Sequence, residues 1–226
     1  MDLGQAKDYT AITIIKRFRE KRPVEYQLQH LERMKGIPYP DQVARVAEII
    51  KSPKLTGYRI FLIVDQTGVG RPVMDMLRAS RLGIPIIAIM IHGGDAVGQE
   101  GQEYRVPKRD LVGVLQVLFQ NKRFQVIRTI PNAELLIQEL MNFKVKINLA
   151  TAHDSYEALR EGDHDDLVLS AAIACWWGEK NPPVDFSQIQ GVGRRPLGQS
   201  SNDQVEIVGD GVGWGSAGNG LDFTGY

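Results

Sequence analysis

The stretch over residues 58–70 constrains the fold of this chain more than any other. It passes from an unbroken apolar run, residues 60–64, directly into Asp65 and a glycine-containing turn. A β-branched and aromatic run that is closed by turn residues is typical of a strand buried on both faces. Asp65 is therefore expected at the rim of a sheet, where open α/β proteins bind ligands. If Asp65 is considered alone, a simpler interpretation is favoured, in which its carboxylate caps the turn or the next helix.

The segments around this strand predict a mixed sheet. A helix that begins near Pro72 and ends at Gly83 leads into a second apolar run, residues 84–91. Strand, helix and strand in this order predict a right-handed crossover between parallel strands. Upstream, a short strand ending at Asp2, a strand-forming run at 11–15 and an alternating segment at 26–34 predict three antiparallel strands.

The remaining segments complete an α/β domain over residues 1–180. Helical spacing or capping signals predict helices at 41–51, 110–118, 131–143 and 167–177, the last of them apolar almost all round. Residues 92–109 form a long polar, glycine-rich loop with room for a small hairpin, 124–127 and 144–149 are strand-like, and 151–162 is a polar turn region. Residues 181–226 are rich in glycine and serine without a sustained period, which predicts a mobile tail.

Composition sets few limits on function. The chain has 27 Lys plus Arg and 27 Asp plus Glu, so global charge neither supports nor excludes a nucleic-acid partner. The single cysteine, Cys175, excludes an internal disulfide and fits a reducing compartment. No apolar run is long enough to span a membrane. We therefore expect a cytoplasmic protein, in the host cytoplasm if the gene is viral.

Acidic residues stand at the ends of three predicted elements. Asp2 ends the first strand, Asp65 ends the central parallel strand, and Asp165 and Asp166 open the apolar helix. The dipole of that helix favours negative charge at its N-terminus. The repulsion that remains would raise a pKa in the group unless a cation binds there. Carboxylates without cysteine select Mg²⁺ or Mn²⁺, and two such ions about 3.5–4 Å apart suit attack on a phosphodiester.

This combination resembles the ribonuclease-H-like nucleases, and among them the C-terminal nuclease domain of the large terminase subunit of tailed bacteriophages. The resemblance covers residues 1–177 and is carried by three segments, Asp2-Leu-Gly-Gln with Asp8-Tyr-Thr-Ala-Ile, Val64-Asp-Gln-Thr-Gly-Val-Gly, and His164-Asp-Asp-Leu-Val-Leu-Ser-Ala-Ala-Ile-Ala. It implies a ribonuclease-H-like sheet flanked by helices, and a metal-dependent endonuclease that cuts concatemeric viral DNA during genome packaging. It also implies that Asp2, Asp65, Asp165 and Asp166 bind two Mg²⁺ or Mn²⁺ ions. Of the α-helical pair we favour Asp166 as the direct ligand, and we expect Asp65 to bridge both ions.

The same resemblance implies partners: double-stranded DNA, an upstream packaging ATPase domain, a small terminase subunit and a portal. The sequence contains no Gly-x-x-x-x-Gly-Lys-Ser/Thr loop, so translocation is not expected of this chain itself. Asp2 also lies so near the start that little of its strand precedes it. Both observations predict an isolated nuclease portion.

Other polar residues are candidates for lesser roles. Arg105, Lys108 and Arg109, beside the long loop, are candidates for contacts with DNA phosphates, and the alternative is a solvated surface turn. Asp8 and His164 are candidates for supporting the metal ligands, and the alternatives are a turn cap and a helix cap.

Three other functions fit parts of this pattern. Another nuclease of the same fold, such as a junction resolvase or a transposase-like enzyme, would use the same acids. A catalytically idle DNA-binding or docking domain would keep the fold alone. An actin-like or sugar-kinase ATPase also opens with Asp-x-Gly, but it needs two related subdomains, and 226 residues with a loose tail are too few.

Overall fold

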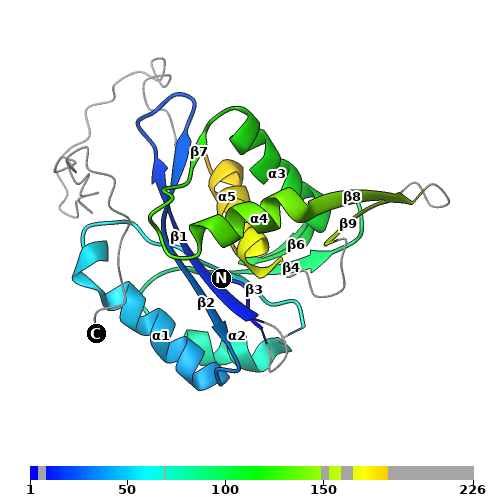
Figure 1. The fold of residues 1–226 in the computed structure, drawn as a ribbon. Helices are drawn as coiled ribbons and strands as arrows, with labels where there is room; N and C mark the ends of the chain where they lie inside the picture. Colours follow the sequence, from blue (N-terminus) through cyan, green and yellow to red (C-terminus); the bar gives the residue numbers. More distant parts are fainter. Residues whose placement is uncertain (5–8, 69, 149–152, 159–164, 183–226) are drawn as a thin grey trace, which may run out of the picture.

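The computed structural model describes residues 1–4, 9–68, 70–148, 153–158 and 165–182. The chain is an α/β protein in which mixed sheets are flanked by helices (Figure 1). The first sheet pairs β1 (Tyr9–Phe18) antiparallel with β2 (Glu25–Lys35), and β2 parallel with β7 (Phe124–Gln125). The second sheet pairs β3 (Leu62–Asp65), β4 (Ile86–His92) and β6 (Glu103–Pro107) in parallel, with β5 (Gly98–Glu100) antiparallel to β6 at its edge.

Residues 1–3 join the two sheets. Asp2 exchanges both backbone hydrogen bonds with Ala11 of β1, each 2.9 Å long, which is an antiparallel bridge. On the other side, the Met1 nitrogen donates to the Ile63 carbonyl (2.8 Å) and the Met1 carbonyl accepts from the Asp65 N–H (2.9 Å), which is the parallel pattern. Residues 1–3 therefore act as a short strand between β1 and β3, and Figure 1 marks the N-terminus at this position.

Helices cover both faces of the strands, because side chains alternate between two cores. Helices α1 (Tyr39–Lys51) and α2 (Gly70–Ala79) pack with Ile12 and Val64 on one face. Helices α3 (Lys108–Gln120), α4 (Ala133–Asn142) and α5 (Asp166–Lys180) pack with Ala11 and Ile63 on the other face. Adjacent residues of one strand thus serve opposite cores, as the pleat of a strand requires.

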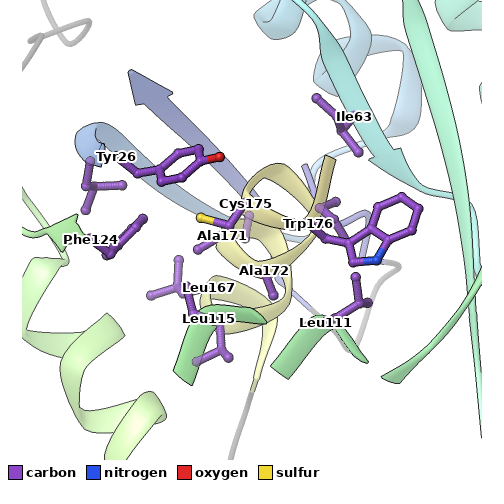
Figure 2. Packing of buried hydrophobic residues seen from close by; sticks show 14 of the residues in the cluster. Tyr26, Ile63, Leu111, Leu115, Phe124, Leu167, Ala171, Ala172, Cys175 and Trp176 are labelled. Carbon is purple, nitrogen blue, oxygen red and sulfur yellow. The ribbon is translucent and has the colours of Figure 1, made fainter. Parts of the chain in front are cut away.

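Helix α5 lies at the centre of the larger core, as its apolar sequence predicts. Figure 2 shows its side chains surrounded by Tyr26 and Phe124 on one side and by Leu111 and Leu115 of α3 below. Trp176 is 6% exposed and meets the Tyr104 ring edge-on, with centroids 5.6 Å apart. A helix that is apolar almost all round packs against neighbours on every side, so its position relative to β1 is tightly determined.

The structure adds strands where the sequence predicts loops. The hairpin allowed for in residues 92–109 is present as β5 and β6, and β6 also extends the parallel sheet beside β4. The strand predicted at 144–149 is β8 (Phe143–Asn148). The turn predicted at 151–162 is wrong in part, because β9 (His153–Ala158) pairs antiparallel with β8. A partner strand outweighs weak intrinsic preference, which is the usual reason for such misses. The tail predicted beyond Pro182 lies outside the described residues.

Within the described ranges, no helix has both the length and the apolar character needed to cross a membrane.

Gly178 tests the close packing of α5 against β2. A Cβ at this position would lie 2.7 Å from the ring carbon Cε1 and the hydroxyl of Tyr26, which is 1% exposed. We expect Gly178→Ala to lower the free energy of unfolding by about 1–3 kcal/mol in urea titrations. Gly113→Ala is the matched helical control, because nothing lies within 4 Å of its Cβ; it should leave stability unchanged or raise it. Equal effects of the two substitutions would contradict the packing described.

Candidate functional site

Asp2 and Asp65 are neighbours across the sheet. Because Met1 bonds to both Ile63 and Asp65, Met1 lies opposite Val64, and Asp2 consequently lies opposite Asp65. Met1 and Val64 belong to the core on the α1 side, so both aspartates point to the α5 side. Adjacent strands are about 4.8 Å apart. The two carboxylates thus share one face of the sheet as well as the edge at which the sequence predicts them.

The turn after β3 holds Asp65 in place. The backbone N–H of Thr67 donates to Oδ1 of Asp65 (2.8 Å), and the Thr67 hydroxyl accepts from the N–H of Ile91 on β4 (2.7 Å). Gly68 follows at a φ of 78°, a left-handed conformation that glycine adopts without a steric cost. Asp65 therefore caps its turn, which is the simpler role the sequence allows.

Helix α5 is fixed to β1 with its N-terminus toward the two aspartates. The Ser170 hydroxyl donates to the Ala11 carbonyl (3.2 Å), and the Thr13 hydroxyl donates to the Ser170 carbonyl (3.1 Å). Ala11 is also the residue bridged to Asp2. The contact therefore sets the first turn of α5, with Asp165 and Asp166, over the end of the sheet that carries Asp2.

Burial and mutual repulsion dominate the electrostatics of Asp2 and Asp65. Burial raises the pKa of Asp2 well above its ordinary value, and the negative charges of Asp65, Asp166 and Asp165 raise it further. Burial also raises the pKa of Asp65, against the hydrogen bond from Thr67 and the charge of Lys108. These two carboxylates are therefore costly to keep ionised by the protein alone, which is the condition in which a bound cation stabilises the ionised form.

The two acids of α5 are balanced by side-chain cations. The Lys108 ammonium lies 2.7 Å from Oδ2 of Asp165, and the Arg33 guanidinium lies 3.0 Å from Oδ2 of Asp166. Asp166 is buried, whereas the Asp165 side chain is 26% exposed. The pair predicted as metal ligands thus forms ion pairs, and this is the main feature of the site that the sequence did not indicate.

Glu139 of α4 is a further acid at this site, and the sequence analysis missed it. Its Oε2 accepts the backbone N–H groups of Leu167 (3.1 Å) and Val168 (3.3 Å), while Oε1 lies 3.6 Å from Arg33. Glu139, and not Asp165, therefore satisfies the first free N–H groups of α5, since Asp165 makes no side-chain cap. The sequence contained a signal for this role, because Glu139 stands three residues after buried Leu136 and therefore lies on the apolar face of α4.

The candidate DNA contacts divide into two groups. Lys108 and Arg109 open α3 beside the acids, and Arg109 pairs with Asp95 (2.7 Å). Arg105 is exposed on β6, and it alternates with Tyr104, which faces α5. Arg105 therefore points to the opposite side of the sheet from Asp65. The other two candidates, Asp8 and His164, lie outside the described residues.

Carboxylate oxygens of Asp2 and Asp65 fit a hard divalent cation such as Mg²⁺ or Mn²⁺. Among the described residues, no group of three or more His, Cys, Asp or Glu side chains is arranged to hold one ion. Asp165 and Asp166 are instead directed to Lys108 and Arg33. The geometry therefore offers two ligands directly, and two more if those acids leave their partners.

Asp2→Asn should stabilise the protein in metal-free buffer. A raised folded-state pKa contributes stability below the ordinary pKa of Asp and loses it as pH rises through the folded-state value. At pH 8 we expect the free energy of unfolding of Asp2→Asn to exceed that of the wild type, and this difference should shrink at low pH. Asp166→Asn is the contrasting variant: it removes the negative charge that lies 3.0 Å from the 12%-exposed Arg33 and should cost about 1–3 kcal/mol. Stability loss in both variants at pH 8 would contradict the repulsion.

Glu139→Gln should remove a pH dependence of stability. Burial raises the pKa of Glu139 from 4.5 to about 7, despite the opposing charge of Arg33. The folded state then binds a proton that the unfolded state releases between about pH 4.5 and 7, so wild-type stability falls as pH rises across this window. Relative to Glu139→Gln, the wild type should lose up to about 3 kcal/mol between pH 4.5 and 8. Parallel pH profiles of the two proteins, measured by urea unfolding, would exclude this shift.

Comparison with known proteins adds no family to these observations, because no family model, no curated protein and no solved structure matches the chain.

Proposed function

We propose that this chain is a metal-dependent endodeoxyribonuclease with a ribonuclease-H-like sheet. The observation that carries the proposal is the placement of Asp2 beside Asp65 on one sheet face, under the acidic first turn of α5. Buried acids brought together from three separate segments are costly in free energy, and they are typical of sites that bind cations or perform acid–base chemistry.

The order of the strands supports the fold part of this proposal. Across the sheet the order is β2, β1, residues 1–3, β3 and β4, with three antiparallel strands followed by parallel ones. This is the arrangement that the resemblance to ribonuclease-H-like nucleases implies. Its acids lie at the strand ends, where α/β sheets bind ligands.

Each residue has a defined task under this proposal. Asp2 and Asp65 would hold the divalent ions, and Asp166 and Asp165 would complete the ligand set. When bound, such ions polarise the scissile phosphate and lower the pKa of water. Glu139 anchors the first turn of α5, so the acids keep their position as charge changes.

Lys108 would interact with the acids in the free protein and with the DNA in the complex. Its side chain is 29% exposed, and its charge acts on both Asp165 and Asp65. A lysine so placed can neutralise the acids in the free protein and contact a DNA phosphate in the complex. Concatemeric viral DNA as substrate, with a packaging ATPase, a small terminase subunit and a portal as partners, rests on the sequence resemblance alone.

A catalytically idle DNA-binding or docking domain is the second candidate. The observation that favours it is the pairing of Asp165 with Lys108 and of Asp166 with Arg33, because acids balanced by protein cations do not require metal. A resolvase or transposase-like nuclease would share the acids, and its preference for branched DNA would distinguish it.

Supercoiled plasmid tests the proposal directly. We expect nicking in Mg²⁺ or Mn²⁺ and its loss by at least about 100-fold in Asp65→Asn, because a positioned metal ligand contributes several kcal/mol to the barrier. Asp41→Asn, an exposed carboxylate in the first turn of α1, is the control and should cut normally. Wild-type protein that binds DNA without nicking it in either metal would establish the idle domain instead. Faster cleavage of four-way junctions than of linear duplex would point to a resolvase.

A further inference from the structure

One guanidinium nitrogen of Arg33 lies between two carboxylates that come from different helices. Its Nη2 is 3.0 Å from Oδ2 of Asp166, at the start of α5, and 3.6 Å from Oε1 of Glu139 on α4. The first distance is that of a hydrogen bond, whereas the second is too long for one. Arg33 therefore pairs with Asp166 and has Glu139 as a second carboxylate within reach.

Glu139 has a buried oxygen that lacks a hydrogen bond. The residue is 7% exposed, and its Oε2 accepts the backbone N–H groups of Leu167 and Val168. Among the described residues, no donor forms a hydrogen bond with its Oε1. A buried carboxylate oxygen without a donor is costly in free energy. Arg33, 3.6 Å away, is placed to supply the missing donor.

The guanidinium of Arg33 is held in a position from which it can reach Glu139. Its Cζ lies 3.8 Å from the centroid of the Tyr9 ring, so the ring supports it on one side. The Arg33 side chain is 12% exposed, and within the described ranges its Nε has no hydrogen-bond partner. A shift of about 1 Å would bring Nη2 to the roughly 2.7–2.9 Å of a charge-assisted hydrogen bond with Glu139.

We propose that Arg33 is a positioning residue with two partners, which holds Asp166 in the free protein and passes to Glu139 when Asp166 turns to a divalent cation. This inference rests on the proposed metal-dependent function, because it takes Asp166 as a ligand of the ion. Without the exchange of partners, the turn of Asp166 would leave Arg33 as a buried cation without a carboxylate, which is strongly unfavourable. Glu139 removes that cost and gains the donor that its Oε1 lacks.

Lys108 offers a contrast to Arg33. Its side chain is 29% exposed, compared with 12% for Arg33, and it pairs with Asp165 at 2.7 Å. If Asp165 leaves this lysine, water or a DNA phosphate can contact its ammonium instead. Arg33 has less access to water, so a second carboxylate is needed beside it. Lys108 is therefore the matched control for Arg33.

A thermodynamic cycle on Mn²⁺ affinity at pH 8, measured by titration calorimetry, tests the exchange of partners. Glu139 is ionised at that pH, because burial raises its pKa to about 7. In Glu139→Gln the amide oxygen can still accept the N–H groups of α5, but the amide nitrogen that replaces Oε1 cannot accept from Arg33. We expect this substitution to weaken Mn²⁺ binding at least about tenfold in the otherwise wild-type chain and less than about threefold in Arg33→Gln. In Lys108→Gln the tenfold effect should persist.

Equal weakening in all three backgrounds would overturn the exchange, because a simple loss of negative charge acts in the same way whether or not Arg33 is present. That result would leave the proposed nuclease in place. Absence of Mn²⁺ binding by the wild type would instead overturn the exchange and the metal-dependent function together.

A crystal structure of the wild type with Mn²⁺ tests the exchange without any substitution, so it holds even if a variant fails to fold. We expect Asp166 to contact the ion and Nη2 of Arg33 to lie about 3 Å from Oε1 of Glu139. Bound Mn²⁺ with Arg33 still paired to Asp166 would show that the inference is wrong.

Discussion

The backbone pairing of residues 1–3 with two different strands is the interaction on which the rest of the structure depends. It joins the antiparallel sheet to the parallel sheet, and it sets Asp2 beside Asp65. The hydrogen bonds alone are each worth only about 1 kcal/mol. Their larger effect is geometric, because a shift of one residue would turn Asp2 to the α1 side and Met1 to the α5 side. The acid site and the apolar core on the α1 side are thus set by the same register.

The site is built from groups that oppose folding and groups that offset them. Asp2 and Asp65 are held in surroundings that disfavour their charge. Arg33 and Lys108 balance the acids of α5, and Glu139 satisfies the N–H groups at the start of that helix. Such an arrangement costs stability at one position, and the close packing of α5 supports it from behind.

Local patterns in the sequence were enough to predict the elements that carry the site. The apolar run before Asp65 is closed by a glycine turn, and the apolar segment after Asp166 is too long for a strand, so the strand and the helix were predicted correctly. β9 was missed because its residues have little strand preference, and pairing with β8 decides their conformation. Glu139 and Arg33 were missed because each lies on an element whose other residues satisfy a simple core pattern, and their role depends on contacts with α5.

The sequence by itself determined the α/β class, the buried strand that ends in Asp65 and the central apolar helix, and it pointed to the four aspartates at the ends of these elements, because these follow from residue type and pattern along the chain. Only the tertiary structure decided that Asp2 faces the same side as Asp65, that Lys108 and Arg33 hold the acids of α5, and that Glu139 caps this helix. These features depend on register and on contacts between residues far apart in the chain, and local sequence patterns carry no information about either.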